Sequence, residues 1–249
     1  MKRALNIWIL LVFIICMFLT GCTEENKIIE SQSPTDIGTR VNHTLREEQK
    51  KPEIKIDERL EAYKKENPDV IALIQIPDTL LEYPLMYREG EEEYYLRKDI
   101  HGEYDIGGLP FMQQGCSLYE NNVFIYGHYF KTGEMFGCLH NYLNNEEFYD
   151  SHKDIIITTA TEKQIWRIFA VCEMHVEEAG FIYNSAEYIN FNTYAEFDKY
   201  ISSIQKNNKL NTEETINYSD RVMFLSTCYD YSGSSKRIVA FAKLIDSHM

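Results

Sequence analysis

The stretch Val222-Met223-Phe224-Leu225-Ser226-Thr227-Cys228 begins with four large apolar residues and ends on a thiol. Nine residues after Cys228, Arg237 opens a second apolar run, Ile238–Ala242, and an earlier run, Val123–Gly127, is followed by His128. Short apolar runs of this composition predict buried β-strands. Further strand-like segments are found at 70–76, 81–86, 104–112, 154–160 and 164–176. Many short strands with few helices predict a mainly β fold of the α+β type, a closed or nearly closed barrel.

Two helices are predicted beside these strands. Residues 55–67 form a charged segment with scattered apolar side chains, which Pro68 ends. Residues 192–207 carry Phe197, Tyr200, Ile201 and Ile204 at three- and four-residue spacing, which is the period of an amphipathic helix. The acidic segment 91–96 predicts a short helix whose charged face is solvated.

Three residue types with complementary chemistry lie at the ends of predicted strands. The Cys228 thiol is a nucleophile that needs a nearby base or positive charge, because a free thiol is mostly protonated at neutral pH. His128 titrates in the range useful for proton transfer. Arg237 stays charged and offers a planar fork of donors suited to an oxyanion or to a carbonyl of the substrate. Taken singly, each has a structural explanation; together they predict acyl transfer.

The size and charge of the chain limit the possible functions. Of 249 residues, those from 55 onward make one globular domain, and 44% apolar content is enough for a core. The formal net charge is −14, and no basic stripe exists to neutralise phosphates, which argues against a nucleic-acid partner. Residues 23–54 are polar and aperiodic and predict a flexible linker.

The N-terminus predicts attachment to a membrane. Met1-Lys2-Arg3 is followed by a mostly apolar run to Thr20 and then by Gly21-Cys22 and acidic residues, which places the rest of the chain outside the cytoplasm. Leu19-Thr20-Gly21-Cys22 resembles a bacterial lipobox, in which Cys22 would be lipidated. An uncleaved membrane anchor at 1–22 is the alternative, and both interpretations leave the protein held at the membrane.

Four cysteines remain after residue 22, and outside the cell they could form two disulfides. Cys172 lies inside an apolar strand, where an unpaired cysteine behaves as a small hydrophobe. A domain of this size needs no disulfides for stability. We therefore expect Cys228 to be a free thiol.

Several segments together resemble class B sortases. Ile125-Tyr126-Gly127-His128 followed by Lys131–Phe136 is similar to the histidine segment, Leu225–Cys228 to the signature Thr-Leu-x-Thr-Cys, and Lys236–Val239 to the arginine strand. Phe224 departs from the signature, which has Thr there. The segments Ile74–Thr79, Tyr83-Pro84, Tyr94–Leu96 and Leu109–Phe111, and the helix before the cysteine strand, follow the class B order from about residue 55 onward.

This resemblance implies a closed eight-stranded barrel with an N-terminal helix and a longer helix before the cysteine strand. It implies a cysteine transpeptidase at a Gram-positive cell surface, which cleaves a C-terminal sorting signal after Thr through a thioester. The acyl group would pass to an amine of a peptidoglycan cross-bridge or of a pilin lysine. His128, Cys228 and Arg237 would be catalytic, and Ser226, Thr227, Ile182 and Tyr183 would contact the sorting peptide; no metal or cofactor is expected.

Other cysteine enzymes fit less well. Papain-like enzymes place Cys before His, the reverse of the order here. L,D-transpeptidases carry a compact Ser-x-Gly-Cys segment, and Gly115-Cys116 lacks the preceding Ser. The remaining alternative is a non-catalytic, membrane-tethered surface lipoprotein that uses a sortase-like barrel for binding.

Overall fold

The computed structural model describes residues 57–143, 145–176, 185–228, 230 and 235–248. Within these ranges the strands are β1 (Val70–Gln75), β2 (Glu82–Met86), β3 (Phe111–Met112), β4 (Asn122–Tyr126), β5 (Asp154–Thr158), β6 (Lys163–His175), β7 (Val222–Cys228) and β8 (Lys236–His248). The α-helices are α1 (Glu58–Glu66), α2 (Glu146–Ser151), α4 (Ser185–Tyr188) and α5 (Tyr194–Asn207), with 3-10 helices η1 (Tyr94–Arg97) and η2 (Gly137–Leu143).

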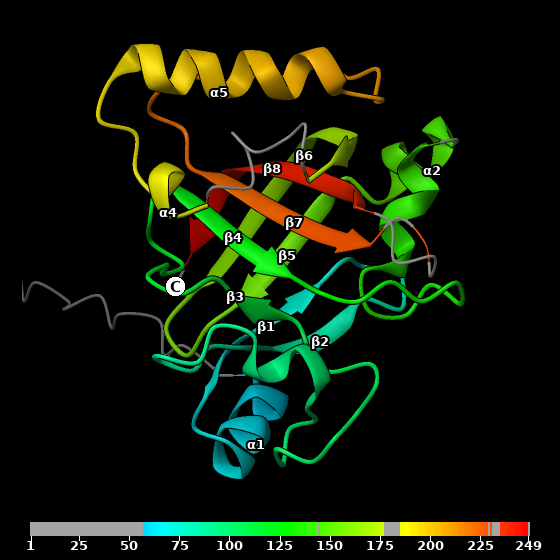
Figure 1. Cartoon of the computed structure of the whole chain (residues 1–249), viewed down its shortest axis with the longest axis vertical. Coiled ribbons are helices and arrows are strands. Elements are labelled where there is room, and N and C mark those ends of the chain that lie inside the picture. Colours follow the sequence, from blue (N-terminus) through cyan, green and yellow to red (C-terminus); the bar gives the residue numbers. More distant parts are fainter. Residues whose placement is uncertain (1–56, 144, 177–184, 229, 231–234, 249) are drawn as a thin grey trace, which may run out of the picture. The chain divides into compact units, whose positions relative to one another are not determined.

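The eight strands close into one barrel in the order β1-β2-β3-β4-β7-β8-β6-β5. This confirms the mainly β fold and the closed eight-stranded barrel, with α1 before it and α5 before β7. Strands β4 and β7 pair in parallel, and Figure 1 shows their arrowheads side by side and pointing the same way. Because parallel neighbours end at the same edge, the residues that follow β4 and β7 come together there.

An aromatic layer packs between this part of the sheet and α5. Phe224 of β7 is fully buried, and its ring lies 5.0 Å from that of Phe124 in β4 and 5.5 Å from that of Phe241 in β8, measured between centroids. The ring of Tyr200 in α5 lies 6.4 Å from that of Phe241, measured between centroids. The helix buries Phe197, Tyr200 and Ile204, three of the four residues whose spacing predicted it. Phe224 is therefore a core residue, and its departure from the signature is accommodated by packing.

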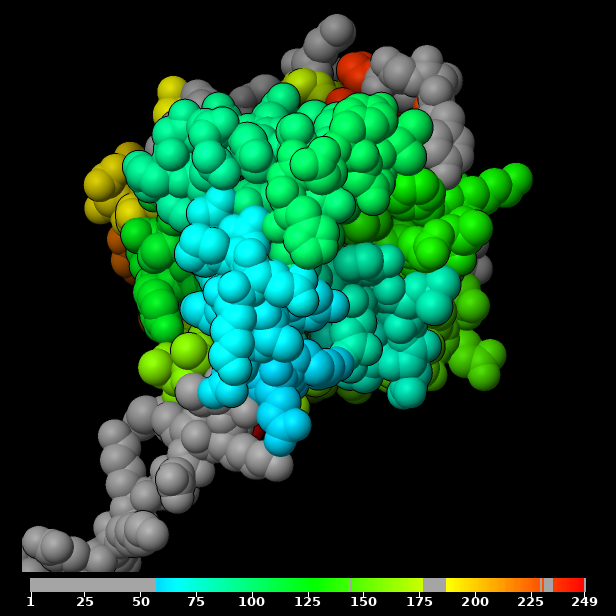
Figure 2. Space-filling view, turned by 90° about the horizontal axis from the view of Figure 1, so that it is seen from below, coloured from blue at the N-terminus to red at the C-terminus, as the bar shows by residue number. Residues whose placement is uncertain are grey.

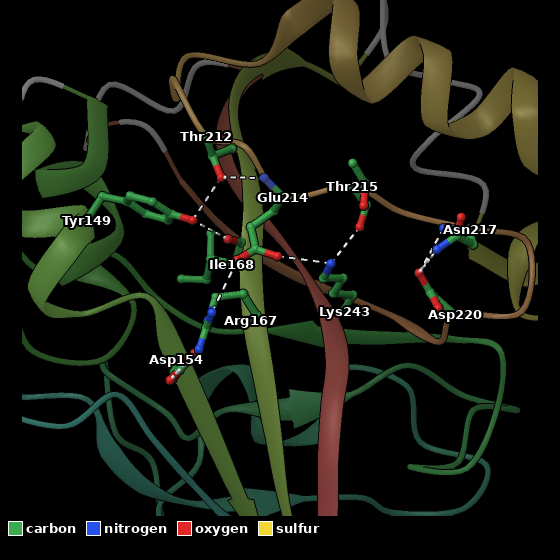
Figure 3. A network of polar contacts seen from close by, with 10 residues as sticks. All are labelled: Tyr149, Asp154, Arg167, Ile168, Thr212, Glu214, Thr215, Asn217, Asp220 and Lys243. Carbon is green, nitrogen blue, oxygen red and sulfur yellow. Dashed lines mark hydrogen bonds and ion pairs between the residues drawn. The ribbon is translucent and has the colours of Figure 1, made fainter.

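A network of charges attaches the segment between α5 and β7 to the barrel (Figure 3). Arg167 of β6 forms a two-pronged ion pair with Asp154 of β5 and a second ion pair, at 3.2 Å, with Glu214. Glu214 also pairs with Lys243 of β8 at 2.9 Å, and Lys243 donates to the Thr215 carbonyl. The segment that leads into the cysteine strand is thus held directly against β6 and β8, and Arg167 links it to β5.

The predicted strand 104–112 is wrong except at Phe111–Met112, which form β3. The preceding residues fold as a loop against η1, because Gly108 has a positive φ of 53° and lies so close that an added Cβ would collide with the Tyr95 carbonyl oxygen. The predicted helix 91–96 begins later than expected, as the 3-10 helix η1.

Among the described residues, no helix has the length and apolar character needed to cross a bilayer. The predicted anchor at 1–22 with Cys22, and the whole of the predicted linker at 23–54, lie outside the described residues. Ile182 and Tyr183 also lie outside them.

Candidate active site

A cleft of about 630 Å³ opens at the edge of the barrel where β4 and β7 end. The three residues that the sequence singled out, His128, Cys228 and Arg237, all line it. Ser226 and Thr227 line it as well. The cleft also includes Glu92, Glu93, Leu96, Arg97, Phe111, Gln113, Tyr126, Gly127 and Val176.

Cys228 and Arg237 are brought together by antiparallel pairing. They lie directly opposite one another in the register of β7 and β8, at the last residue of one strand and the second of the next. Cys228 is a free, half-buried thiol, so it is open to the cleft. The Arg237 guanidinium donates to the Lys236 carbonyl oxygen at 2.9 Å, and Lys236 is itself paired with Glu173 at 2.6 Å. These contacts hold the arginine beside the thiol strand.

His128 reaches the same edge through the parallel strand. The Gly127 amide, one residue past β4, donates to the Ser226 carbonyl oxygen in β7 at 3.1 Å, so His128 is placed beside the end of the strand that carries Cys228. Glycine is required at 127 because an added Cβ would lie 2.9 Å from the Phe136 ring. The Phe136 amide then donates to the His128 carbonyl oxygen at 3.0 Å and fixes the turn.

Among the described residues, one nitrogen of the His128 ring has a hydrogen-bond partner. Nε2 lies 2.7 Å from the Leu96 carbonyl oxygen, and because a carbonyl only accepts, Nε2 must carry the hydrogen. In the neutral ring, Nδ1 is then the nitrogen that can accept a proton. Burial lowers the pKa of His128; the Leu96 carbonyl and Asp105 oppose that effect, while Arg97 adds to it.

Ser226 and Thr227 are nearly inaccessible, with 3% and 2% of their surfaces exposed. The Thr227 hydroxyl is buried without a hydrogen-bond partner among the described residues. Their predicted role in contacting the sorting peptide stays a prediction.

The sequence reasoning missed the part of the cleft that comes from the segment between β2 and β3. Glu92 and Glu93 were interpreted as a solvated helix face, yet they line the cleft, and the buried Gln113 amide donates to Glu92. Leu96 acts through its backbone carbonyl, which no side-chain pattern reveals. The sequence did offer one indication of this part of the cleft: Tyr94–Leu96 is among the segments that resemble class B sortases.

The other cysteines of the described domain are buried and free. Burial raises the pKa of Cys116 to about 11 and the pKa values of Cys138 and Cys172 to about 12. Cys228 is the thiol that lines the cleft. Within the described ranges, no three His, Cys, Asp or Glu side chains gather as metal ligands would.

Comparison with known proteins agrees with this arrangement. The sortase domain family matches residues 74–245. Sortase B of Staphylococcus aureus is 28% identical over 98% of both chains. The solved Staphylococcus aureus sortase B–substrate complex has a TM-score of 0.66 and 28% identity, over 76% of this chain and 85% of that one. A sortase B complexed with triglycine has the same score and identity, over 76% and 86%. The chain therefore belongs to the sortase family of transpeptidases, and the relatives it resembles are of class B.

Proposed function

We propose that the protein is a cell-surface cysteine transpeptidase that cleaves a C-terminal sorting signal after Thr and transfers the new carboxyl end to an amine. The observation that carries this proposal is the single cleft lined by Cys228, His128 and Arg237, three residues from three strand ends. A thiol, a proton carrier and a fixed positive charge are the groups that acyl transfer through a thioester needs.

In the first half-reaction, the Cys228 thiol gives its proton to His128, and the thiolate attacks the Thr carbonyl carbon. The carbon–sulfur bond forms, and the carbonyl oxygen becomes an oxyanion that Arg237 stabilises. When the carbon–nitrogen bond breaks, the departing amine takes the proton from His128. The C-terminal part of the sorting signal leaves, and a thioester remains on Cys228.

In the second half-reaction, a neutral amine attacks the thioester carbon. A new amide bond forms, the carbon–sulfur bond breaks, and the proton of the amine returns through His128 to the sulfur. Because the Leu96 carbonyl occupies Nε2–H, the transferred proton is carried at Nδ1. Water in place of the amine gives slow hydrolysis.

The partners follow from the same reaction. The donor is a surface protein that bears a sorting motif, and the acceptor is an amine of a peptidoglycan cross-bridge or of a pilin lysine. The known substrate and triglycine complexes of sortase B support a peptide donor and an amine acceptor. Residues 1–22 hold the protein at the outer face of the membrane, by a lipidated Cys22 or as an uncleaved anchor, and residues 23–54 link them to a catalytic domain at 55–249.

The test is a fluorogenic peptide-cleavage screen over candidate sorting pentapeptides, with and without an added amine. We expect one peptide class to be cleaved and the amide product to appear with the amine. Cys228→Ala abolishes both activities, and Cys116→Ala, which removes a buried thiol elsewhere, retains them. Cleavage that persists in Cys228→Ala removes the mechanism.

Thiol labelling separates this function from a non-catalytic binding barrel. At pH 7.5 we expect iodoacetamide to label Cys228 at least about 100-fold faster than Cys116, Cys138 or Cys172, because their raised pKa values leave little thiolate. Peptide mapping by mass spectrometry gives the four rates. Equal labelling, or none, favours the binding barrel.

A further inference from the structure

We propose that Tyr95 is a positioning residue for His128: its buried hydroxyl, held by Asn67 and Asp69, fixes η1 where the Leu96 carbonyl meets the histidine ring. This inference rests on the proposed function, in which His128 carries the proton. Tyr95, Asn67 and Asp69 do not line the cleft, and they act on His128 through the backbone carbonyl of Leu96.

The hydroxyl of Tyr95 is anchored at two points. It donates to Asp69 Oδ2 at 2.7 Å and accepts from Asn67 Nδ2 at 2.8 Å. The ring is 1% exposed and is the buried side chain of η1. Burial, and next the hydrogen bond to Asp69, raise the pKa of Tyr95 to about 12, so the hydroxyl keeps its proton and remains a donor.

The two anchoring residues are themselves fixed to rigid elements. Asn67 is the C-cap of α1, and its backbone N–H donates to the Tyr63 carbonyl oxygen. The Asp69 amide donates to Asn67 Oδ1 at 2.9 Å, and the Asp69 carbonyl oxygen accepts from the Tyr87 amide after β2 at 2.9 Å. Figure 2 shows the face on which α1 and the segment after β2 pack side by side.

The backbone of η1 is held from the other side by the loop that leads to β3. The Leu109 amide donates to the Tyr95 carbonyl oxygen at 3.0 Å. Gly108 packs so closely that an added Cβ would lie 2.5 Å from the Leu96 carbonyl oxygen. The next residue of η1 after Tyr95 is therefore confined between this loop and His128.

The carbonyl that accepts from His128 belongs to that next residue, Leu96. Its bond to Nε2 is 2.7 Å long, and a displacement of roughly 1 Å takes it beyond hydrogen-bonding distance. The ring would then lose the contact that selects the Nε2–H tautomer and its orientation. Removing the Tyr95 hydroxyl leaves η1 held only by the loop on its other side, and the residues that flank the tyrosine in η1 are only partly buried, so this change permits that displacement.

Two charged groups near the ring also belong to this region, since Arg97 lies in η1 and the Asp105 amide donates to the Arg97 carbonyl oxygen. Both act on the pKa of His128 through their charge, whereas the hydrogen bond to the Leu96 carbonyl selects which ring nitrogen carries the hydrogen. Cys228 lies on a different strand. A change in tautomer caused by loss of the tyrosine hydroxyl therefore reports on the Leu96 contact.

The experiment compares Tyr95→Phe with Tyr149→Phe. Tyr149 is 8% exposed and its hydroxyl also makes two hydrogen bonds, to Ile168 and Thr212, far along the chain from η1. We expect Tyr95→Phe to lower kcat by about tenfold with KM unchanged, because small misplacements of a catalytic group are costly. In a Cys228→Ala background, the ¹⁵N imidazole shifts of His128 should show a reduced Nε2–H fraction. Tyr149→Phe changes neither readout.

A second pair of variants changes Asp69, the residue that accepts the hydrogen bond of the Tyr95 hydroxyl. Asp69→Asn keeps an oxygen that accepts from Tyr95 and should retain the Nε2–H tautomer, whereas Asp69→Ala should behave as Tyr95→Phe. An unchanged tautomer in Tyr95→Phe, or an equal loss of kcat in Tyr149→Phe, overturns the inference. Because the tautomer is read without turnover, failure of the wild-type protein to cleave any peptide would count against the proposed function alone.

Discussion

Phe224→Thr places in β7 the residue that the sortase signature has at this position. Phe224 is fully buried, and its ring lies 5.0 Å from Phe124, 5.5 Å from Phe241 and 6.0 Å from Tyr126. Since two of these partners belong to β4 and one to β8, the ring joins the strand that carries Cys228 to both of its neighbours. The substitution removes the ring and leaves a hydroxyl in its place.

The magnitude follows from three terms. Truncating a buried phenylalanine costs about 3–5 kcal/mol through lost transfer energy and the residual cavity. Each aromatic pair contributes about 0.5–1.5 kcal/mol, part of which is already included in that figure. A buried hydroxyl without a partner costs about 1–3 kcal/mol, and the remaining Thr methyl offsets some of it. We expect a loss of about 4 kcal/mol in the free energy of unfolding.

Thermal unfolding measures this loss directly. A domain of this size shifts by about 2–4 °C per kcal/mol, so the melting temperature should fall by about 8–16 °C. Tyr104→Ala is the matched surface control, because Tyr104 is 73% exposed, and it should change the free energy by less than about 0.5 kcal/mol. A fall of under about 2 °C for Phe224→Thr would refute the view that this ring is part of the core that joins β7 to β4 and β8.

Three further predictions concern charge. Arg237→Lys keeps a positive charge but loses the planar fork, and kcat/KM should fall by about tenfold or more in the peptide assay; near-normal turnover would mean that charge alone suffices. Because folding lowers the pKa of His128, the unfolded chain takes up a proton on this ring at a higher pH than the folded chain does. The stability that neutral His128 contributes above about pH 6.5 is therefore lost as the pH falls through the pKa of the folded state. His128→Gln should reduce the dependence on pH of the free energy of unfolding, measured with urea, over that window. An unchanged dependence on pH contradicts the prediction. Arg167→Met leaves Asp154 and Glu214 without their shared cation and should cost about 2 kcal/mol by urea unfolding at pH 7, and a cost near zero would show that the network is dispensable.

Local pattern was sufficient for most of the strands and for the identity of the three candidate catalytic residues. The runs 70–76, 123–127 and 222–228 were predicted from apolar composition, because these strands bury most of their side chains. The helix at 192–207 was predicted from its period, because it buries one face, at Phe197, Tyr200 and Ile204. The strand predicted at 104–112 failed because Gly107-Gly108 belong to a loop and not to a strand. Gly108 lets this loop pack against the backbone of Tyr95. The apolar pattern of 104–112 contains no sign of that contact, because Tyr95 lies outside the segment.

The sequence by itself determined that a thiol, an imidazole and a guanidinium each lie at the end of a strand, because the positions where apolar runs begin and stop mark the strand ends. Only the tertiary structure decided that these ends share one edge, because that depends on β4 pairing in parallel with β7 across about a hundred residues of chain. It also decided that a backbone carbonyl at Leu96 would select the tautomer of His128. Backbone acceptors are the same in every residue, so their placement is visible only in the folded chain.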